Sequence, residues 1–202
     1  MGKGLLIVVS GPAGSGKGTV NAKLLALPEY AFSVSATTRA PRPGEVNGKN
    51  YWYISREEFE ARIDRGEMLE YTEYCGNYYG TPKKEAEEVL ASGKNLILEI
   101  EVRGAMNVKR LYPEAVLIML LPPSFAAQEA RLRRRGTETE EKIRARLDKT
   151  REELEHLNDY DYLVINREGG ADECAEEIRA IVRAEKRAIK RHPNAKTEYF
   201  GT

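Results

Sequence analysis

The segment GPAGSGKGT, residues 11–19, constrains the fold of this chain more than any other, and only Ser10 separates it from the apolar run LLIVV. It matches the pattern G-x-x-x-x-G-K, with Gly11, Gly16 and Lys17 at the fixed positions. Glycines let successive backbone N–H groups converge on phosphate oxygens, and a following helix presents its positive end to them. The succession of strand, loop and helix predicts a nucleoside triphosphate site.

Within this loop, Lys17 is expected to reach the β- and γ-phosphates. Gly18 stands where Ser or Thr would coordinate Mg²⁺, so we expect Thr19 to assist a metal only indirectly. The alternative is a glycine-rich turn that happens to contain a lysine. The triphosphate-binding residues predicted here are Gly11, Pro12, Ala13, Gly14, Ser15, Gly16, Lys17, Gly18 and Thr19.

Apolar runs alternate with helical patterns along most of the chain, and this order predicts a parallel sheet covered by helices on both faces. The segment 37–79 is the exception, because short strands cluster there as a small insertion. Strands are expected at 5–9, 32–35, 51–54, 95–101, 115–121 and 162–166. Helices are expected at 18–27, from 55 onward, at 82–93 with Thr81 as cap, at 124–135, at 140–157 with Thr137 as cap, and at 172–190.

Charge and cysteine content narrow the class of protein. The 202 residues carry 32 basic and 32 acidic side chains, and a net charge of zero gives no general reason to expect nucleic acid or a membrane surface as partner. No apolar run is long enough for a signal peptide or a membrane span. Cys75 and Cys174 lack metal-ligand spacing, and a disulfide between them is not expected. A cytoplasmic location is therefore predicted.

Two carboxylates end the apolar run LILEIE. Glu99 and Glu101 are two residues apart and should share one face of a strand. Carboxylates at the end of a strand beside a phosphate loop are placed to hold Mg²⁺ or to accept a hydrogen bond from a substrate. The alternative is a strand that simply runs out into solvent.

Arginines stand on a proline-stiffened loop earlier in the chain. Arg39 and Arg42 alternate with Pro41 and Pro43, and two guanidinium groups on a rigid loop suit a phosphate dianion. Ser35 and Tyr51 supply hydroxyl groups nearby. Without other information, two arginines in a polar loop are usually solvated surface charges.

Three motifs together resemble guanylate kinase, from about residue 4 to 181. They are FSVSATTRAPRPGEVNGKNY, GNYYGTP at 76–82 and RGTETEEKIRAR at 135–146. The resemblance implies transfer of the γ-phosphoryl group of ATP to GMP with Mg²⁺ as cofactor, giving ADP and GDP, and we expect dGMP to be accepted as well. It implies ATP and GMP as the only partners, without nucleic acid, membrane or an obligatory protein.

The resemblance also assigns the acceptor site. A carboxylate and a hydroxyl would complement the N1–H and N2–H donors and the O6 acceptor of guanine, whereas adenine has an acceptor at N1. The residues implied for the GMP phosphate are Ser35, Arg39, Arg42, Tyr51 and Tyr79, and those for guanine are Glu70, Thr81 and Glu101. Thr81 as a helix cap, Tyr79 as core and Glu70 as a strand-end charge are the alternatives. The family often has aspartate where Glu99 and Glu101 stand, so the division of roles between metal and guanine stays open.

Basic residues implied for the transferring phosphoryl group follow later. Arg131 and Arg135 are four residues apart on one helical face, and Arg146 lies on the next helix. These three would close over the triphosphate, while Arg133 and Arg134 should point to solvent. Asn166 matches a family position near the adenine, or is a turn residue. The catalytic set expected is Lys17, Arg39, Arg131, Arg135 and Arg146.

The implied fold is a P-loop NTPase-type parallel sheet flanked by helices, with a small mixed α/β GMP-binding insertion and a helical lid. The expected limits are a domain at 4–184, a core at 1–34, 83–122 and 150–190, an insertion at 35–82, a lid at 123–149 and a flexible tail at 191–202. Two alternatives are a kinase for another nucleoside monophosphate and a non-catalytic guanylate kinase-like binding module. The intact loop with Lys17 argues against the binding module.

Overall fold

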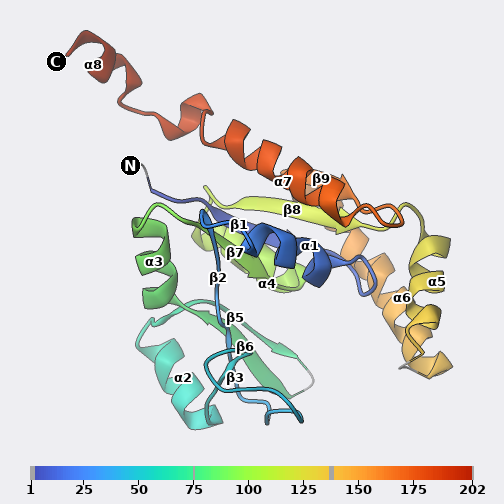
Figure 1. The fold of residues 1–202 in the computed structure, drawn as a ribbon. Coiled ribbons are helices and arrows are strands. Elements are labelled where there is room, and N and C mark those ends of the chain that lie inside the picture. Colours follow the sequence, from blue (N-terminus) through green and yellow to red (C-terminus); the bar gives the residue numbers. More distant parts are fainter. Residues whose placement is uncertain (1–2, 75, 137–138, 202) are drawn as a thin grey trace.

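A five-stranded sheet forms the centre of the molecule (Figure 1). The computed structural model describes residues 3–74, 76–136 and 139–201, so Cys75 and the expected cap Thr137 lie outside the described residues. The strands are β1 (Leu6–Ser10), β2 (Tyr30–Phe32), β7 (Asn95–Glu99), β8 (Val116–Leu121) and β9 (Tyr162–Ile165). Their order is β2-β7-β1-β8-β9, and every pairing is parallel. The parallel sheet is confirmed.

Helices cover both faces of this sheet. They are α1 (Lys17–Leu25) and α7 (Ala171–Glu185) on one face, and α3 (Lys83–Ala91) and α4 (Val102–Leu111) on the other. Successive side chains of a strand point to opposite faces. Ile7 and Val9 accordingly pack with α1 and α7, whereas Leu6 and Val8 pack with α3 and α4. Burial on both sides explains why the strands read as continuous apolar runs.

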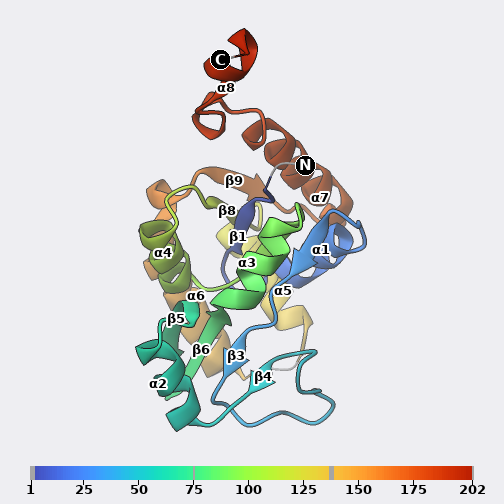
Figure 2. The same cartoon turned by 90° about the vertical axis from the view of Figure 1, so that its left-hand side faces the viewer.

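A second, four-stranded sheet lies beside the first (Figure 2). It consists of β3 (Ala36–Thr37), β4 (Trp52–Tyr53), β5 (Met68–Tyr74) and β6 (Asn77–Pro82), in the order β4-β3-β6-β5. It is mixed, because β3 pairs with β4 in parallel and with β6 antiparallel. Helix α2 (Arg56–Asp64) packs on it through Phe59, which is fully buried and stacks on Tyr78 with a ring separation of 5.1 Å.

Helices α5 (Phe125–Arg134) and α6 (Glu140–Leu154) form a pair at one end of the central sheet (Figure 1). A small apolar cluster of Leu132, Ile143 and Leu147 joins them. Helix α5 begins as expected after Ser124, whose side chain accepts a hydrogen bond from the N–H of Ala127. Thr139 caps α6.

The chain ends in an extension that leaves the body of the molecule (Figures 1 and 2). A 3₁₀ turn, η1 (Leu157–Asp159), precedes β9, and a second one, η2 (Ile189–Arg191), follows α7. The segment expected to be a flexible tail contains the short helix α8 (Ala195–Phe200). None of the helices among the described residues is both long and apolar enough to span a membrane.

Several expected boundaries are wrong. The strand expected at 32–35 is two separate strands, because the chain leaves the central sheet after Phe32 and joins the second sheet at Ala36. Strand β7 ends at Glu99, and Glu101 is the N-cap residue of α4, a helix the sequence pattern did not reveal. The expectation that Glu99 and Glu101 share one face of a strand is therefore also wrong.

Candidate active site

The phosphate loop joins β1 to α1, as the sequence predicts. Gly16 precedes α1 in the left-handed conformation, with φ of 93°, and a Cβ atom there would lie 2.3 Å from Asn166 Nδ2. Gly11 is equally confined, since a Cβ atom would lie 2.1 Å from the carbonyl oxygen of Leu120. Only glycine fits these two positions, and the loop therefore approaches its neighbours through bare backbone.

Side chains hold the carbonyl groups of this loop. Lys17 Nζ donates to the carbonyl of Gly11 at 2.5 Å and to that of Pro12 at 3.3 Å. The next three carbonyls accept hydrogen bonds from α5 and from the end of β9: Gln128 to Ala13 at 2.9 Å, Arg131 to Gly14 at 3.4 Å, and Asn166 to Ser15 at 2.7 Å. In a trans peptide the N–H points opposite to the C=O. The N–H groups of these peptides are thereby directed away from the groups that hold the carbonyls.

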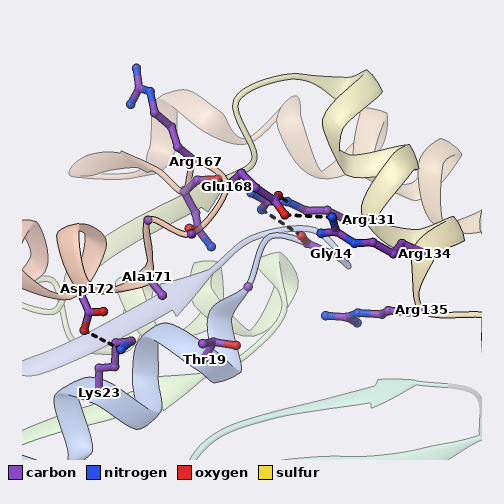
Figure 3. A pocket seen from close by; sticks show the side chains of 14 residues that line it. Gly14, Thr19, Lys23, Arg131, Arg134, Arg135, Arg167, Glu168, Ala171 and Asp172 are labelled. Atoms are coloured by element: carbon purple, nitrogen blue, oxygen red, sulfur yellow. Dashed lines mark hydrogen bonds and ion pairs between the residues drawn. The ribbon is translucent and has the colours of Figure 1, made fainter.

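A basic cavity of about 480 Å³ lies beside the loop (Figure 3). Gly14, Gly16 and Thr19 line one side of it. Four arginines line the other parts: Arg131, Arg134, Arg135 and Arg167. Phosphate groups bind where guanidinium groups and loop N–H groups meet. The predicted residues Arg131, Arg135 and Asn166 are all part of this lining.

Two arginines of this cavity are not among the predicted site residues. Arg134 is exposed, as expected, and it also lines the cavity and pairs with Glu168 at 2.9 Å, because the loop after β9 approaches the end of α5. Glu168 also lies 3.7 Å from Arg131. Arg167 is a lining residue that the sequence did not single out, although it directly follows Asn166.

A second cavity of about 240 Å³ lies between the two sheets and is lined by residues of both. It gathers six predicted residues from distant parts of the chain: Ser35, Tyr51, Glu70, Tyr79, Glu99 and Glu101. Thr72, which sequence reasoning missed, also lines it. Thr72 is two residues from Glu70 on β5, so its side chain points to the same face of the strand, and this alternation could have predicted its place in the cavity.

Glu70 is the most deeply buried carboxyl group of this cavity, with 3% of the residue exposed. Thr81 Oγ1 donates to Glu70 Oε1 at 2.8 Å across the β5–β6 pair. Burial raises the pKa of Glu70 to about 7, although the hydrogen bond from Thr81 lowers it. Thr81 is thus not the helix cap that was one interpretation of the sequence. It contacts the cavity through Glu70, to whose carboxylate it donates.

Arg39 is held by an unforeseen partner. Its Nη2 lies 2.9 Å from both carboxylate oxygens of Glu45, and its guanidinium group lies 5.6 Å from the ring centre of Tyr51. The backbone N–H of Arg42, the Tyr53 hydroxyl and Arg39 lower the pKa of Glu45 to about 2. Glu45 closes the turn that carries Arg39 and Arg42. Its place in the same short polar loop, six residues after Arg39, is the only indication of this ion pair that the sequence offers.

The two other carboxylates that line the second cavity have separate partners. Glu99 accepts a hydrogen bond from Asn21 Nδ2 at 2.8 Å, and Glu101 pairs with Lys149 Nζ of α6 at 2.8 Å. Burial lowers the pKa of Lys17, while Glu99, Glu153 and Glu101 raise it and Arg135 lowers it further. The pKa of Lys17 therefore depends on charged residues that line both cavities, Glu99 and Glu101 in the second and Arg135 in the first.

Some predicted residues do not meet in these linings. Among the described lining residues, the second cavity lacks Arg39, Arg42 and Thr81, and neither cavity includes Arg146. Arg39 and Thr81 nevertheless contact lining residues, Tyr51 and Glu70. Arg42 and Arg146 are exposed.

Comparison with known proteins gives one consistent result. The family model described as guanylate kinase matches residues 3–185. The guanylate kinase of Desulfitobacterium hafniense (strain Y51) is 48% identical over 191 residues, which cover 94% of each chain. That of Halalkalibacterium halodurans is 54% identical over 184 residues, covering 91% of this chain and 89% of the relative. The crystal structure of guanylate kinase from Anaplasma phagocytophilum is similar with a TM-score of 0.73 and 36% identity, covering 92% of this chain and 87% of that one.

Proposed function

The chain belongs to the guanylate kinase family, and on this premise we propose how its residues carry out the reaction. The protein is an ATP-dependent kinase that converts ATP and GMP into ADP and GDP. One observation supports the assignment of sides: the first cavity is lined by the phosphate loop and four arginines, whereas the second contains the buried carboxyl group of Glu70. We assign the first cavity to ATP and the second to GMP.

On the ATP side, backbone N–H groups of the loop and the start of α1 receive the phosphates. Lys17 and the arginines of the cavity neutralise the charge that develops on the transferring group, and the reaction needs little else from the protein. Arg131 has the most fixed position of these arginines, because it also donates to the carbonyl of Asn166 at 2.7 Å. We propose Arg135 and Arg146 as groups that complete the site when α5 and α6 close.

On the GMP side, Arg39 and Arg42 bind the phosphate dianion together with the hydroxyls of Ser35, Tyr51 and Tyr79. The Glu45 carboxylate fixes the Arg39 guanidinium in advance, so less freedom is lost when the phosphate binds. One oxygen atom of the GMP phosphate attacks the γ-phosphorus of ATP, and the bond to the β-phosphate oxygen breaks as ADP leaves.

Glu70, Thr81 and Glu101 form the guanine-reading set in this proposal. A carboxylate accepts hydrogen bonds from guanine N1–H and N2–H, whereas it would face the lone pair of adenine N1. Glu70 suits this role because it is buried and already oriented by Thr81. Buried polar groups left unpaired by the wrong base are costly, and selection against that base follows.

The oxygen atoms near the loop fit a hydrated Mg²⁺ ion. Glu99 stands at the end of β7, and Asn21 Oδ1 beside it is buried without a hydrogen-bond partner among the described residues. Mg²⁺ prefers oxygen ligands and keeps several waters when it binds nucleotide phosphates. We propose that Glu99 and Thr19 hold the ion largely through water. When bound, the ion supplies further neutralisation of the β- and γ-phosphates.

The substrates also bear on location. ATP and GMP, together with Cys174 as a free buried thiol, favour the cytoplasm as the place of the reaction.

The test of the proposed function is ADP formation from ATP and Mg²⁺ with GMP, dGMP, AMP, UMP or CMP as acceptor. We expect rapid turnover with GMP, turnover with dGMP, and kcat/KM at least 10²-fold lower with AMP. Comparable turnover with AMP would overturn the guanine assignment. Absence of ADP formation with every acceptor would contradict the kinase activity itself.

A further inference from the structure

A buried chain of hydrogen bonds connects the phosphate loop to the backbone of Arg146. Gln128 Nε2 donates to the carbonyl of Ala13 at 2.9 Å and to Thr150 Oγ1 at 2.8 Å. Thr150 Oγ1 in turn donates to the carbonyl of Arg146 at 2.9 Å. Both N–H bonds of the Gln128 amide are used, and the threonine hydroxyl both accepts and donates. The hydrogen-bond chain therefore runs in one direction, and every N–H and O–H donor of the two side chains has an acceptor.

The surroundings indicate that this chain is more than packing. Gln128 and Thr150 are 1% and 2% exposed, and the contact between α5 and α6 next to them is apolar, formed by Leu132, Ile143 and Leu147. Apolar side chains would fill such an interface without the desolvation that a buried amide and hydroxyl require. An amide here gains instead a directional link to a specific carbonyl of the loop.

The loop end of this link is in van der Waals contact with α5. A Cβ atom at Gly14 would lie 3.4 Å from Leu132 Cδ2 and 3.6 Å from the carbonyl oxygen of Gln128, so the loop packs directly on α5. The hydrogen bond from Gln128 fixes Ala13, the residue just before. A movement of α5 relative to the loop therefore changes the phosphate-binding backbone.

The other end of the hydrogen-bond chain is the backbone carbonyl of Arg146. The Arg146 side chain is exposed, whereas its carbonyl is fixed through Thr150, one helical turn later. The backbone from which its guanidinium group extends is thereby tied to the loop. A supporting residue that fixes the backbone of a functional residue reduces the number of conformations from which the side chain must reach its productive geometry.

We propose that Gln128 and Thr150 are positioning residues that couple the phosphate loop to Arg146, so that the loop and α6 adopt the catalytic arrangement together. The inference rests on the role of Arg146 given under Proposed function. It assigns neither residue a contact with substrate. The two act through the backbone of Ala13 and of Arg146.

The test is a double-mutant cycle between position 150 and Arg146 in the full-length protein. Thr150→Val removes the hydroxyl at nearly constant volume, and Thr150→Ser restores it. We expect Thr150→Val to lower kcat about fivefold with the KM for GMP unchanged, as loss of one buried hydrogen bond implies. Thr150→Ser should keep the wild-type kcat. In the Arg146→Ala background, Thr150→Val should have no further effect, because the group that it positions is gone.

Two outcomes contradict the coupling: a folded Thr150→Val protein with wild-type kcat, or the same fivefold loss in the Arg146→Ala background. If Thr150→Val does not fold, Gln128→Met cuts the chain at its other member and enters the same cycle with the same expectations. An inactive wild-type protein would instead contradict the proposed function. An active wild type with an unaffected variant contradicts only the coupling.

Discussion

The cavities that we assign to ATP and to GMP are built in opposite ways. The phosphate loop of the ATP side is one continuous segment. Side chains donate hydrogen bonds to each of its carbonyl groups from Gly11 to Ser15. Among the described residues, the lining of the cavity assigned to GMP includes no such loop. Its polar groups are side chains from both sheets, and they include a buried carboxyl group, Glu70.

This difference separates two tasks. Backbone N–H groups recognise phosphate in any nucleotide, because every nucleotide triphosphate presents the same oxygens. In our proposal, side chains such as Glu70 and Thr81 present a donor and acceptor pattern that matches guanine and not adenine. We therefore expect charge neutralisation to depend on the ATP side and base selection on the GMP side.

The largest effect is expected from Lys17→Ala. The substitution removes a partly buried cation from the phosphate loop and also frees the carbonyls of Gly11 and Pro12. We expect kcat to fall by about 10³-fold or more, with the preference for GMP over AMP unchanged. Steady-state ADP formation measures both. Lys84→Ala, on the exposed side of α3, is the matched control, and a Lys17→Ala protein with full turnover would refute the role of the loop.

Glu70→Gln should break the GMP side instead. The amide presents an N–H donor where guanine also donates, and it loses the charge that faces N1–H. We expect kcat/KM with GMP to fall about 10²-fold while that with AMP changes little. Competition between GMP and AMP in one assay gives the ratio directly. Glu88→Gln on α3 serves as the control, and an unchanged GMP preference would remove Glu70 from the guanine-reading set.

The burial of Glu70 also predicts a dependence of stability on pH. Its pKa is about 7 in the folded protein against 4.5 as the ordinary value, so the unfolded chain releases this proton first. The contribution of Glu70 to stability is complete below pH 4.5 and is lost as the pH rises toward 7. Between pH 5 and 8 the free energy of unfolding should fall by about 2 kcal/mol through this group. Urea unfolding of wild type and Glu70→Gln tests this, and parallel pH profiles would contradict it.

A smaller effect is expected from Glu45→Gln. The amide keeps the shape of the turn but loses the charge that holds Arg39. We expect the KM for GMP to rise about tenfold, while kcat and the KM for ATP stay within about twofold. Glu60→Gln on α2 removes an exposed partner of Arg56 and should leave every constant unchanged. A rise in the KM for ATP as well would place Glu45 outside the GMP side.

The sequence predicted elements best where one short pattern determines the structure. The apolar run before the loop, the glycines and Lys17 predicted β1, the loop and α1 almost to the residue. The same approach failed at 32–35, because leaving one sheet for another produces no local pattern. It also missed α4, whose residues follow a strand without an intervening turn signal, so Glu101 was placed on a strand.

By itself, the sequence determined the parallel α/β fold, the phosphate loop and the resemblance that connects the chain to GMP phosphorylation. These follow from residues close together in the chain, whose spacing sets which groups share a strand, a turn or a helix face. Only the tertiary structure decided that Thr81 supports Glu70, that Glu45 holds Arg39, and that Gln128 reaches Ala13 from 115 positions away. The reason is that hydrogen bonds and burial depend on distance in space, which local pattern does not specify.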